Sequence, residues 1–144
     1  LGLDPIVHRF ATSDLRAAFG STKRALKPLQ LDQHVIAGNG NSYADEILHR
    51  ARLHPTRPAH SLDRQRTGRL RDAIVDVLRE AIDAGGSTLG DAQYVDLMGD
   101  GGSYQDEHRV YGRGGERCST CGRGWIRRTV SAGRGTHFCP VCQR

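Results

Sequence analysis

Four cysteines near the C-terminus constrain this chain more than any other feature. They form two Cys-x-x-Cys pairs, Cys118 with Cys121 and Cys139 with Cys142, separated by residues 122–138, and the chain has no other cysteine. Two such pairs can place four thiolates at the corners of a tetrahedron, which is the geometry of a structural zinc site. The pattern predicts one zinc ion bound by all four sulfurs, in a zinc ribbon.

The segment between the two pairs predicts a β-hairpin. Residues 125–130 suit its first arm, residues 132–135 its turn and residues 136–138 its second arm. A unit of about 35 residues with so little apolar surface cannot fold unaided, so we expect the metal to supply most of its folding free energy.

Two disulfides, or one redox-active pair, are the alternatives to zinc. Two intervening residues are few for a bridge within a pair, and the chain carries no apolar signal segment that would mark a secreted protein. A thioredoxin-type pair belongs in a βαβ unit, and the pattern around these cysteines shows none. Zinc is therefore the preferred interpretation.

The positive charge gathers in the same region. Residues 109–144 hold eight arginines against one acid, a balance of +7, whereas residues 1–108 hold 13 basic and 15 acidic side chains, a balance of −2. Four thiolates and one Zn²⁺ would lower the first figure to about +5. Arginine forms bidentate contacts with phosphate, which favours a nucleic-acid partner, although basic faces are often only solvated.

The first two thirds of the chain favour a helical bundle. We expect helices over residues 12–19, ending at Gly20, over residues 23–33, which include Pro28, and from residues 61–63 to about Ala84. The last has an apolar face made by Leu62, Leu70, Ile74, Val77, Leu78, Ala81 and Ile82. Residues 87–110 show no hydrophobic periodicity of a helix or strand, and they contain a glycine-rich loop. No apolar run is long enough for a membrane span.

A glycine turn precedes another expected helix. The segment Gly38-Asn39-Gly40-Asn41 ends an apolar run, and Asn41 or Ser42 can cap the helix that follows, with acids at 45 and 46 in its first turn. The free amides of such a helix start can bind an anion. A plain tight turn between helices has the same pattern, and Gly-x-Gly alone is a weak motif.

Together these stretches resemble one family, the formamidopyrimidine-DNA glycosylases and endonuclease VIII. Residues 38–46 look like its helix-two-turns-helix motif, and residues 110–143 look like its zinc finger, with residues 25–29 and 85–89 also similar. The resemblance spans the chain in order and is closer to the formamidopyrimidine branch. It implies a mainly α fold, a helix-two-turns-helix bundle followed by a small β-hairpin zinc ribbon. We expect a linker at 1–10, a DNA-binding domain at 11–108 and the finger at 109–144.

The resemblance also assigns roles to residues. Asn41, with the amide of Gly40, is similar to the residue that holds a phosphate beside a flipped nucleotide, and Lys27 to a lysine that contacts the backbone near the lesion. Arg134 matches the finger arginine that binds phosphates flanking the extruded base. Tyr43 is in register with a tyrosine near that strand. Residues 97–107 correspond to the loop that closes over an oxidised purine.

The resemblance implies a role in base-excision repair. The expected partner is double-stranded DNA, damaged or abasic, bound by a monomer in the cytoplasm at the nucleoid. The family's chemistry uses an N-terminal proline followed by glutamate, in a β-sandwich domain that precedes the stretch matched here. Pro5 lies in an amide bond and cannot be that nucleophile.

Three interpretations of the chain follow. In the first it is a DNA-binding part that is inactive by itself. In the second it is the C-terminal fragment of an active oxidised-purine glycosylase and AP lyase. In the third it is a zinc-ribbon adaptor for protein interactions.

Overall fold

The computed structural model describes residues 2–6, 9–85 and 103–144. Residues 86–102, which include most of the expected glycine-rich loop, lie outside the described residues. The elements in chain order are α1 (Thr12–Phe19), α2 (Leu26–Leu31), α3 (Asn41–Ala51), the 3₁₀ turn η1 (Ala59–Ser61), α4 (Arg64–Asp83), the 3₁₀ turn η3 (Tyr104–Glu107), β1 (Arg127–Ser131) and β2 (Arg134–Phe138).

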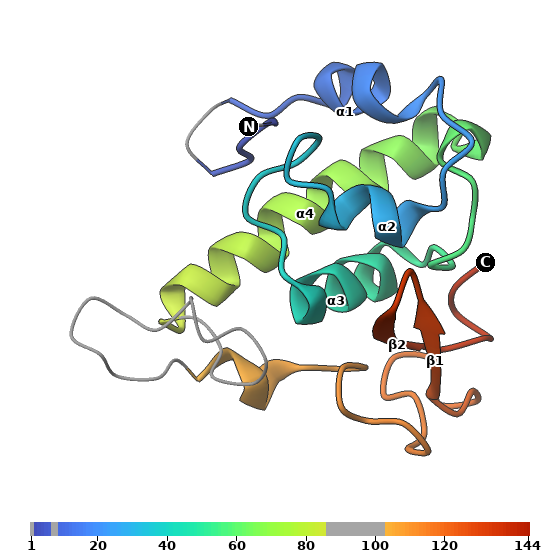
Figure 1. Cartoon of the computed structure of the whole chain (residues 1–144). Helices are drawn as coiled ribbons and strands as arrows, with labels where there is room; N and C mark the ends of the chain where they lie inside the picture. The colour runs from blue at the N-terminus through green and yellow to red at the C-terminus, as the bar shows by residue number, and fades with distance from the viewer. Residues whose placement is uncertain (1, 7–8, 86–102) are drawn as a thin grey trace.

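The helices pack around α4, the longest of them. α3 and α1 both pack against α4, and α2 packs against α3, so the four helices surround one apolar core (Figure 1). Leu70, Ile74 and Val77 of α4 are fully buried in it, as the apolar period predicts. Ile82 differs from that prediction, because at the last turn of α4 the buried face is formed by Ala81 and the Ile82 side chain is 58% exposed.

The ends of α1 and α4 follow local sequence signals. The Asp63 carboxylate accepts the N–H of Arg66 at 2.8 Å and so caps α4, and α1 stops at Gly20 as expected. At the start of α1 the cap is Ala11, whose N–H donates to the Asp14 carboxylate at 2.8 Å. These signals act within one helical turn, so they can be read from the chain alone.

The second helix is shorter than its sequence predicts. α2 begins at Leu26, because Ala25 is extended and bridges Pro58, which comes from the connection between α3 and α4. The N–H groups of Leu26 and Lys27 donate to carbonyls of that connection at 2.9 and 3.0 Å. Pro28 lies in the first turn of α2. Backbone N–H groups there have no acceptor within the helix, so a proline, which lacks an N–H, is tolerated.

The expected linker is paired with the helical unit. Leu3 bridges Ile36 in parallel, and its N–H and carbonyl both bond to the segment between α2 and α3. The described start of the chain therefore lies against the stretch that leads into the glycine turn.

The two strands form the expected hairpin. Arg128 pairs with His137 and Val130 with Gly135, and Ala132 and Gly133 make a two-residue turn with φ of 51° and 76°. Two successive positive φ angles are those of a type I′ turn, which matches the twist of the strands. The turn is thus shorter than the predicted residues 132–135, and Arg134 is the first residue of β2.

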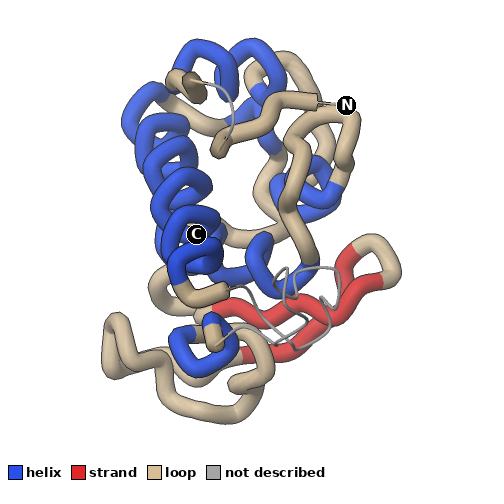
Figure 2. Tube along the Cα trace, turned by 90° about the vertical axis from the view of Figure 1, so that its left-hand side faces the viewer, coloured by secondary structure: helices blue, strands red, loops and turns tan. Residues whose placement is uncertain are grey.

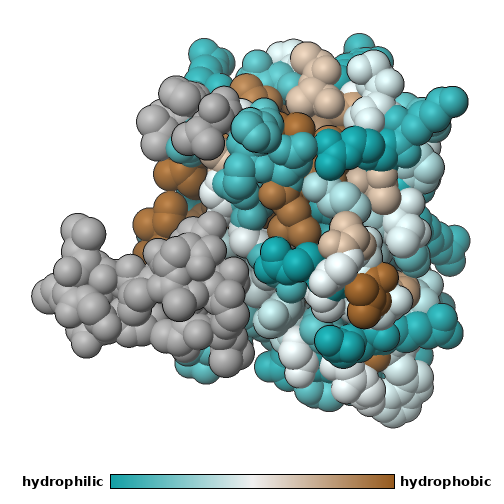
Figure 3. Space-filling view, viewed as in Figure 1, coloured by the Kyte–Doolittle hydropathy of each residue, from teal (hydrophilic) through white to brown (hydrophobic). Residues whose placement is uncertain are grey.

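The hairpin lies along one side of the helical unit, and its turn projects past the helices (Figure 2). Beneath it is a second, small core of Val110, Cys118, Ile126 and Cys139. On the face seen in Figure 3, apolar residues appear only in small separate patches among hydrophilic ones. Within the described ranges no helix is both long and apolar enough to cross a membrane.

Candidate metal centre and nucleic-acid interface

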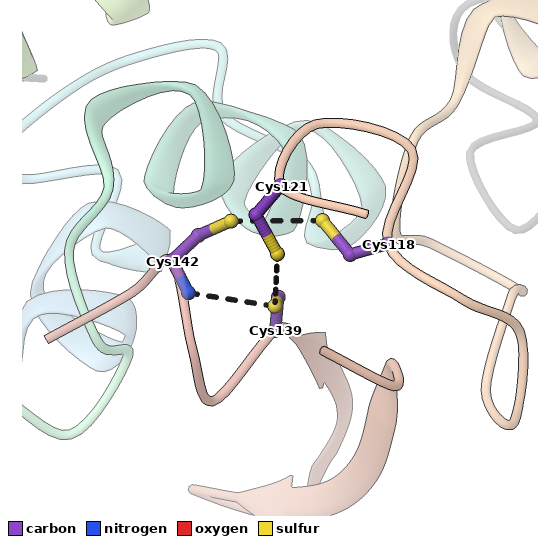
Figure 4. Close-up of side chains that lie close together, drawn as sticks. All are labelled: Cys118, Cys121, Cys139 and Cys142. Atoms are coloured by element: carbon purple, nitrogen blue, oxygen red, sulfur yellow. Dashed lines mark hydrogen bonds between the residues drawn. The ribbon is translucent and has the colours of Figure 1, made fainter. Parts of the chain in front are cut away.

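The four cysteine sulfurs converge on one point (Figure 4). All four Sγ atoms lie within 4.8 Å of one another, with Cys118 and Cys142 3.6 Å apart and Cys121 and Cys139 3.9 Å apart. Zn–S bonds of about 2.3 Å in a tetrahedron place the sulfurs about 3.8 Å apart, whereas a disulfide bond is about 2.05 Å long. The four predicted ligands are therefore positioned to bind one metal ion, and the distances exclude the two-disulfide alternative.

Backbone groups support the sulfurs. The N–H groups of Arg123 and Gly124 donate to Cys121 Sγ at 3.4 and 3.3 Å, and together they lower the pKa of the Cys121 thiol to about 6. The Cys142 N–H donates to Cys139 Sγ at 3.4 Å, but burial outweighs this bond and raises the pKa of the Cys139 thiol. A Cβ at Gly124 would lie 2.4 Å from Cys139 Sγ, so only glycine fits beside that ligand. A lowered thiol pKa favours the thiolate that binds zinc.

One histidine supports the metal centre from the helical unit. His49, buried on α3, places Nε2 3.5 Å from Cys118 Sγ. Burial lowers the pKa of His49 to about 4, and the nearby charges of Arg109 and Arg50 add to this effect. A neutral imidazole can donate Nε2–H to a thiolate, and hydrogen bonds to metal ligands help to orient them. Residue spacing along the chain carries no signal for this contact.

A buried carboxylate on α3 holds the hairpin. Asp45 accepts the N–H of His137 at 2.9 Å and pairs with Lys27 Nζ at 2.6 Å. Lys27 Nζ also donates to Thr136 Oγ1 at 2.8 Å and to the Gly135 carbonyl at 3.0 Å. The Lys27 and Asp45 side chains are fully buried. Through one ion pair and two hydrogen bonds, Lys27 joins α2, α3 and β2.

The neighbouring acid holds the start of the C-terminal unit. Glu46 accepts the N–H groups of Arg109, Val110 and Tyr111 at 2.7, 2.9 and 2.8 Å. Burial raises the pKa of Glu46, and these three bonds oppose the rise. The sequence predicted both acids in the first turn of the helix. That prediction was wrong, because α3 begins at Asn41 and both side chains point into the protein from the second turn.

The start of α3 and the hairpin meet at one hydrogen bond. Asn41 Nδ2 donates to the Gly135 carbonyl at 3.1 Å, directly beside Arg134. The residue that caps α3 is Gly40, in extended conformation, rather than Asn41 or Ser42. Among the described residues, the backbone N–H groups of Gly40 and Asn41 have no hydrogen-bond partner. Free amides at a helix start are the groups that bind anions.

Two arginines lie beside this helix start. Arg134 is exposed, and it is close enough to Lys27 for its charge to help lower the pKa of Lys27, an effect that burial of the lysine dominates. Arg128 Nη2 would lie 3.1 Å from a Cβ at Gly135, so its guanidinium covers the other side of the hairpin. The sequence singled out Arg134 alone. The strand register pairs Arg128 with His137 and Arg134 with Ser131, which places the two arginines on opposite faces of the hairpin.

The other two predicted contacts are inside the protein. Lys27 is engaged as described above, and Tyr43 is 2% exposed, with its ring packed edge-on against Tyr104 at 5.8 Å. That either residue touches a ligand stays a prediction. In this arrangement Lys27 can reach an outside group only by exchanging one of its three acceptors.

Two family models match this chain. Residues 1–93 match the formamidopyrimidine-DNA glycosylase H2TH domain, and residues 115–144 match the zinc finger found in FPG and IleRS. The chain belongs to the formamidopyrimidine-DNA glycosylase family. The predicted family, the fold class and the zinc cofactor are thereby confirmed.

Individual relatives of the family agree with this assignment. The formamidopyrimidine-DNA glycosylase of Heliobacterium modesticaldum is 52% identical over 144 residues, which are 100% of this chain and 51% of that protein. The MutM (Fpg) structure from Thermus thermophilus has a TM-score of 0.89 at 49% identity, over 99% of this chain and 53% of that one. Lactococcus lactis Fpg in complex with DNA containing an abasic site has a TM-score of 0.89 at 38% identity, over 100% and 52%. The present chain thus spans about half the length of these relatives.

Proposed function

We propose that this chain binds the sugar-phosphate backbone of double-stranded DNA at a damaged or abasic nucleotide, as the DNA-binding part of a base-excision-repair glycosylase. One observation carries the proposal: the hydrogen bond from Asn41 to the Gly135 carbonyl brings an anion-binding helix start and the exposed arginine of the zinc hairpin to one place. The free amides of Gly40 and Asn41 bind one phosphate, and Arg134 binds a neighbouring one.

Contacts of this kind position DNA without reading its sequence. They suit a protein that must act wherever damage occurs, on chromosomal DNA at the nucleoid. Holding a strand at two successive phosphates also helps to keep a nucleotide out of the stack, which costs a few kcal/mol and least at a damaged or abasic position. The relatives solved with abasic and lesion-containing DNA support this choice of partner.

Lys27 and Tyr43 support the same function as buried residues that position the DNA-binding groups. Lys27 fixes the Gly135 carbonyl through which Asn41 meets the hairpin, and Tyr43 packs the start of α3 against the core. Both residues would set the separation of the two phosphate-binding groups. A side chain that acts by positioning changes DNA affinity together with the stability of the hairpin, whereas Arg134 changes affinity alone.

Base removal and strand cleavage are proposed only for a longer protein that contains this chain. Borohydride trapping on an oxidised-guanine or abasic duplex tests the 144-residue chain directly, since a Schiff base is reduced to a stable adduct. We expect no adduct. A covalent adduct would assign lyase chemistry to this chain and overturn the binding-only function.

The test of binding uses a fluorescent duplex with one abasic site and measures anisotropy over a range of salt concentrations. Arg134→Ala and Asn41→Ala should each weaken binding by about 1–3 kcal/mol, and Arg134→Ala should also reduce the salt dependence. Arg16→Ala, an exposed arginine on α1, is the charge-matched control and should change neither. Affinity that is independent of salt and of Arg134 would refute the proposal and favour the protein-adaptor alternative.

A further inference from the structure

A second group of positive side chains lies at the opposite end of α3. A hollow of about 550 Å³ opens between the end of α3 and the first Cys-x-x-Cys pair, and its lining includes Arg50, Arg52, Arg109, Arg123 and Thr120. α3 has 11 residues, so about 16 Å separates this hollow from Asn41. It is therefore distinct from the proposed DNA surface around Arg134.

The arginines of the hollow are mostly unpaired. Arg50 is held by Glu80, whose two carboxylate oxygens lie 2.9 Å from Nη1 and Nη2 of the guanidinium. Arg52, Arg109 and Arg123 have no carboxylate partner within the described ranges, and no Asp or Glu lines the hollow there. Three separate chain segments thus bring arginines to one cavity, whose volume is that of a small-ligand site.

The metal centre does not cancel this charge. Cys121 and Cys142 also line the hollow, and a zinc ion with four thiolates carries a charge of −2. The four arginines contribute +4, Glu80 contributes −1 and the metal centre −2, so the net charge is about +1. The hollow stays positive when the metal is bound.

We propose that this hollow is a second anion site, which binds a phosphate group through Arg52, Arg109 and Arg123, with Thr120 as a hydroxyl donor. Planar guanidinium groups match phosphate oxygens in pairs, and Arg50, already fixed by Glu80, adds a preorganised charge. The phosphate belongs either to a nucleic-acid backbone that runs past the metal centre or to a small phosphorylated molecule.

Pyrophosphate titrated into the zinc-loaded chain tests the site. We expect saturable changes in the amide NMR signals of residues 109, 120 and 123, and about tenfold weaker binding in the double variant Arg109→Gln/Arg123→Gln. Arg9→Gln/Arg16→Gln removes two exposed charges elsewhere and should leave pyrophosphate affinity unchanged. Equal affinity in both double variants would overturn the proposal.

Two further measurements separate the remaining outcomes. If DNA supplies the phosphate, Arg109→Gln/Arg123→Gln also lowers the salt slope of duplex binding; if only pyrophosphate binding is lost, the ligand is a small phosphate compound. Both results support the site. Loss of zinc from the variant without loss of pyrophosphate binding would overturn it and assign the arginines to the metal. Arg134→Ala should not alter pyrophosphate binding here, so this test and that of the proposed function fail independently.

Discussion

The helical unit (residues 12–83) and the C-terminal unit (residues 109–144) are stabilised by different means. Among the described residues, the helical core buries a continuous set of apolar side chains on all four helices, whereas the core of the C-terminal unit is Val110, Ile126 and two of the cysteines. The second unit compensates with four metal ligands and with bonds to Asp45 and Glu46 of α3. A small unit can thus be placed accurately on a larger one with little apolar burial of its own.

Metal removal should have the largest effect on this comparison. Chelation, or Cys139→Ser, should unfold the C-terminal unit, because structural zinc supplies on the order of 10 kcal/mol. α1 to α4 should keep their structure. Circular dichroism reports the helices, and the fluorescence of Trp125, the single tryptophan, reports the C-terminal unit. Simultaneous loss of both signals would show that the helical unit is not independent.

Loss of the Asp45 carboxylate on α3 should have the next largest effect. Asp45→Asn leaves Lys27 as a buried, unpaired charge, so we expect a loss of about 3–5 kcal/mol in the free energy of unfolding. Zinc content should remain, since no metal ligand is touched. Asp76→Asn, at an exposed position of α4, is the control and should change stability by no more than about 0.5 kcal/mol. Equal effects of the two variants in urea denaturation would contradict the bridging role of Asp45.

An apolar truncation should affect the helical unit alone. Ile74→Ala removes a fully buried side chain of α4 and should cost about 2–5 kcal/mol. Ile82→Ala, on the same helix but exposed, should cost little. Thermal unfolding of both variants, with zinc analysis, provides the measurement. Zinc loss at the temperature where the Ile74→Ala helices melt would mean that α3 must be folded for the finger to hold its metal.

The smallest expected effect concerns two glycines. Gly133→Ala should destabilise the hairpin by about 1–2 kcal/mol, because its φ of 76° is unfavourable for any side chain. Gly68→Ala should instead stabilise the protein by about 0.5–1 kcal/mol, since Gly68 lies inside α4 with open space around a new Cβ. Denaturant titrations measure the change in the free energy of unfolding for each variant. Changes of opposite sign would confirm that Gly133 is required by the geometry of the hairpin turn, and changes of the same sign would contradict it.

Local signals determined much of this protein from its sequence. The spacing of Cys118, Cys121, Cys139 and Cys142 predicts the metal centre, and Asp63 and Gly20 mark helix ends, because ligand spacing and capping act over a few residues. The glycine turn before Asn41 likewise predicts a helix start with free amides.

Tertiary structure alone decided the roles of the charged residues. Lys27 and Thr136 are 109 positions apart, and Glu46 and Val110 are 64 apart, so no local pattern shows that the lysine and the acids are buried and bonded to the C-terminal unit. The cost of burying a charge is met only when distant groups fold against it. For the same reason the arginine-lined hollow exists only where the end of α3, the segment at Arg109 and the first cysteine pair come together.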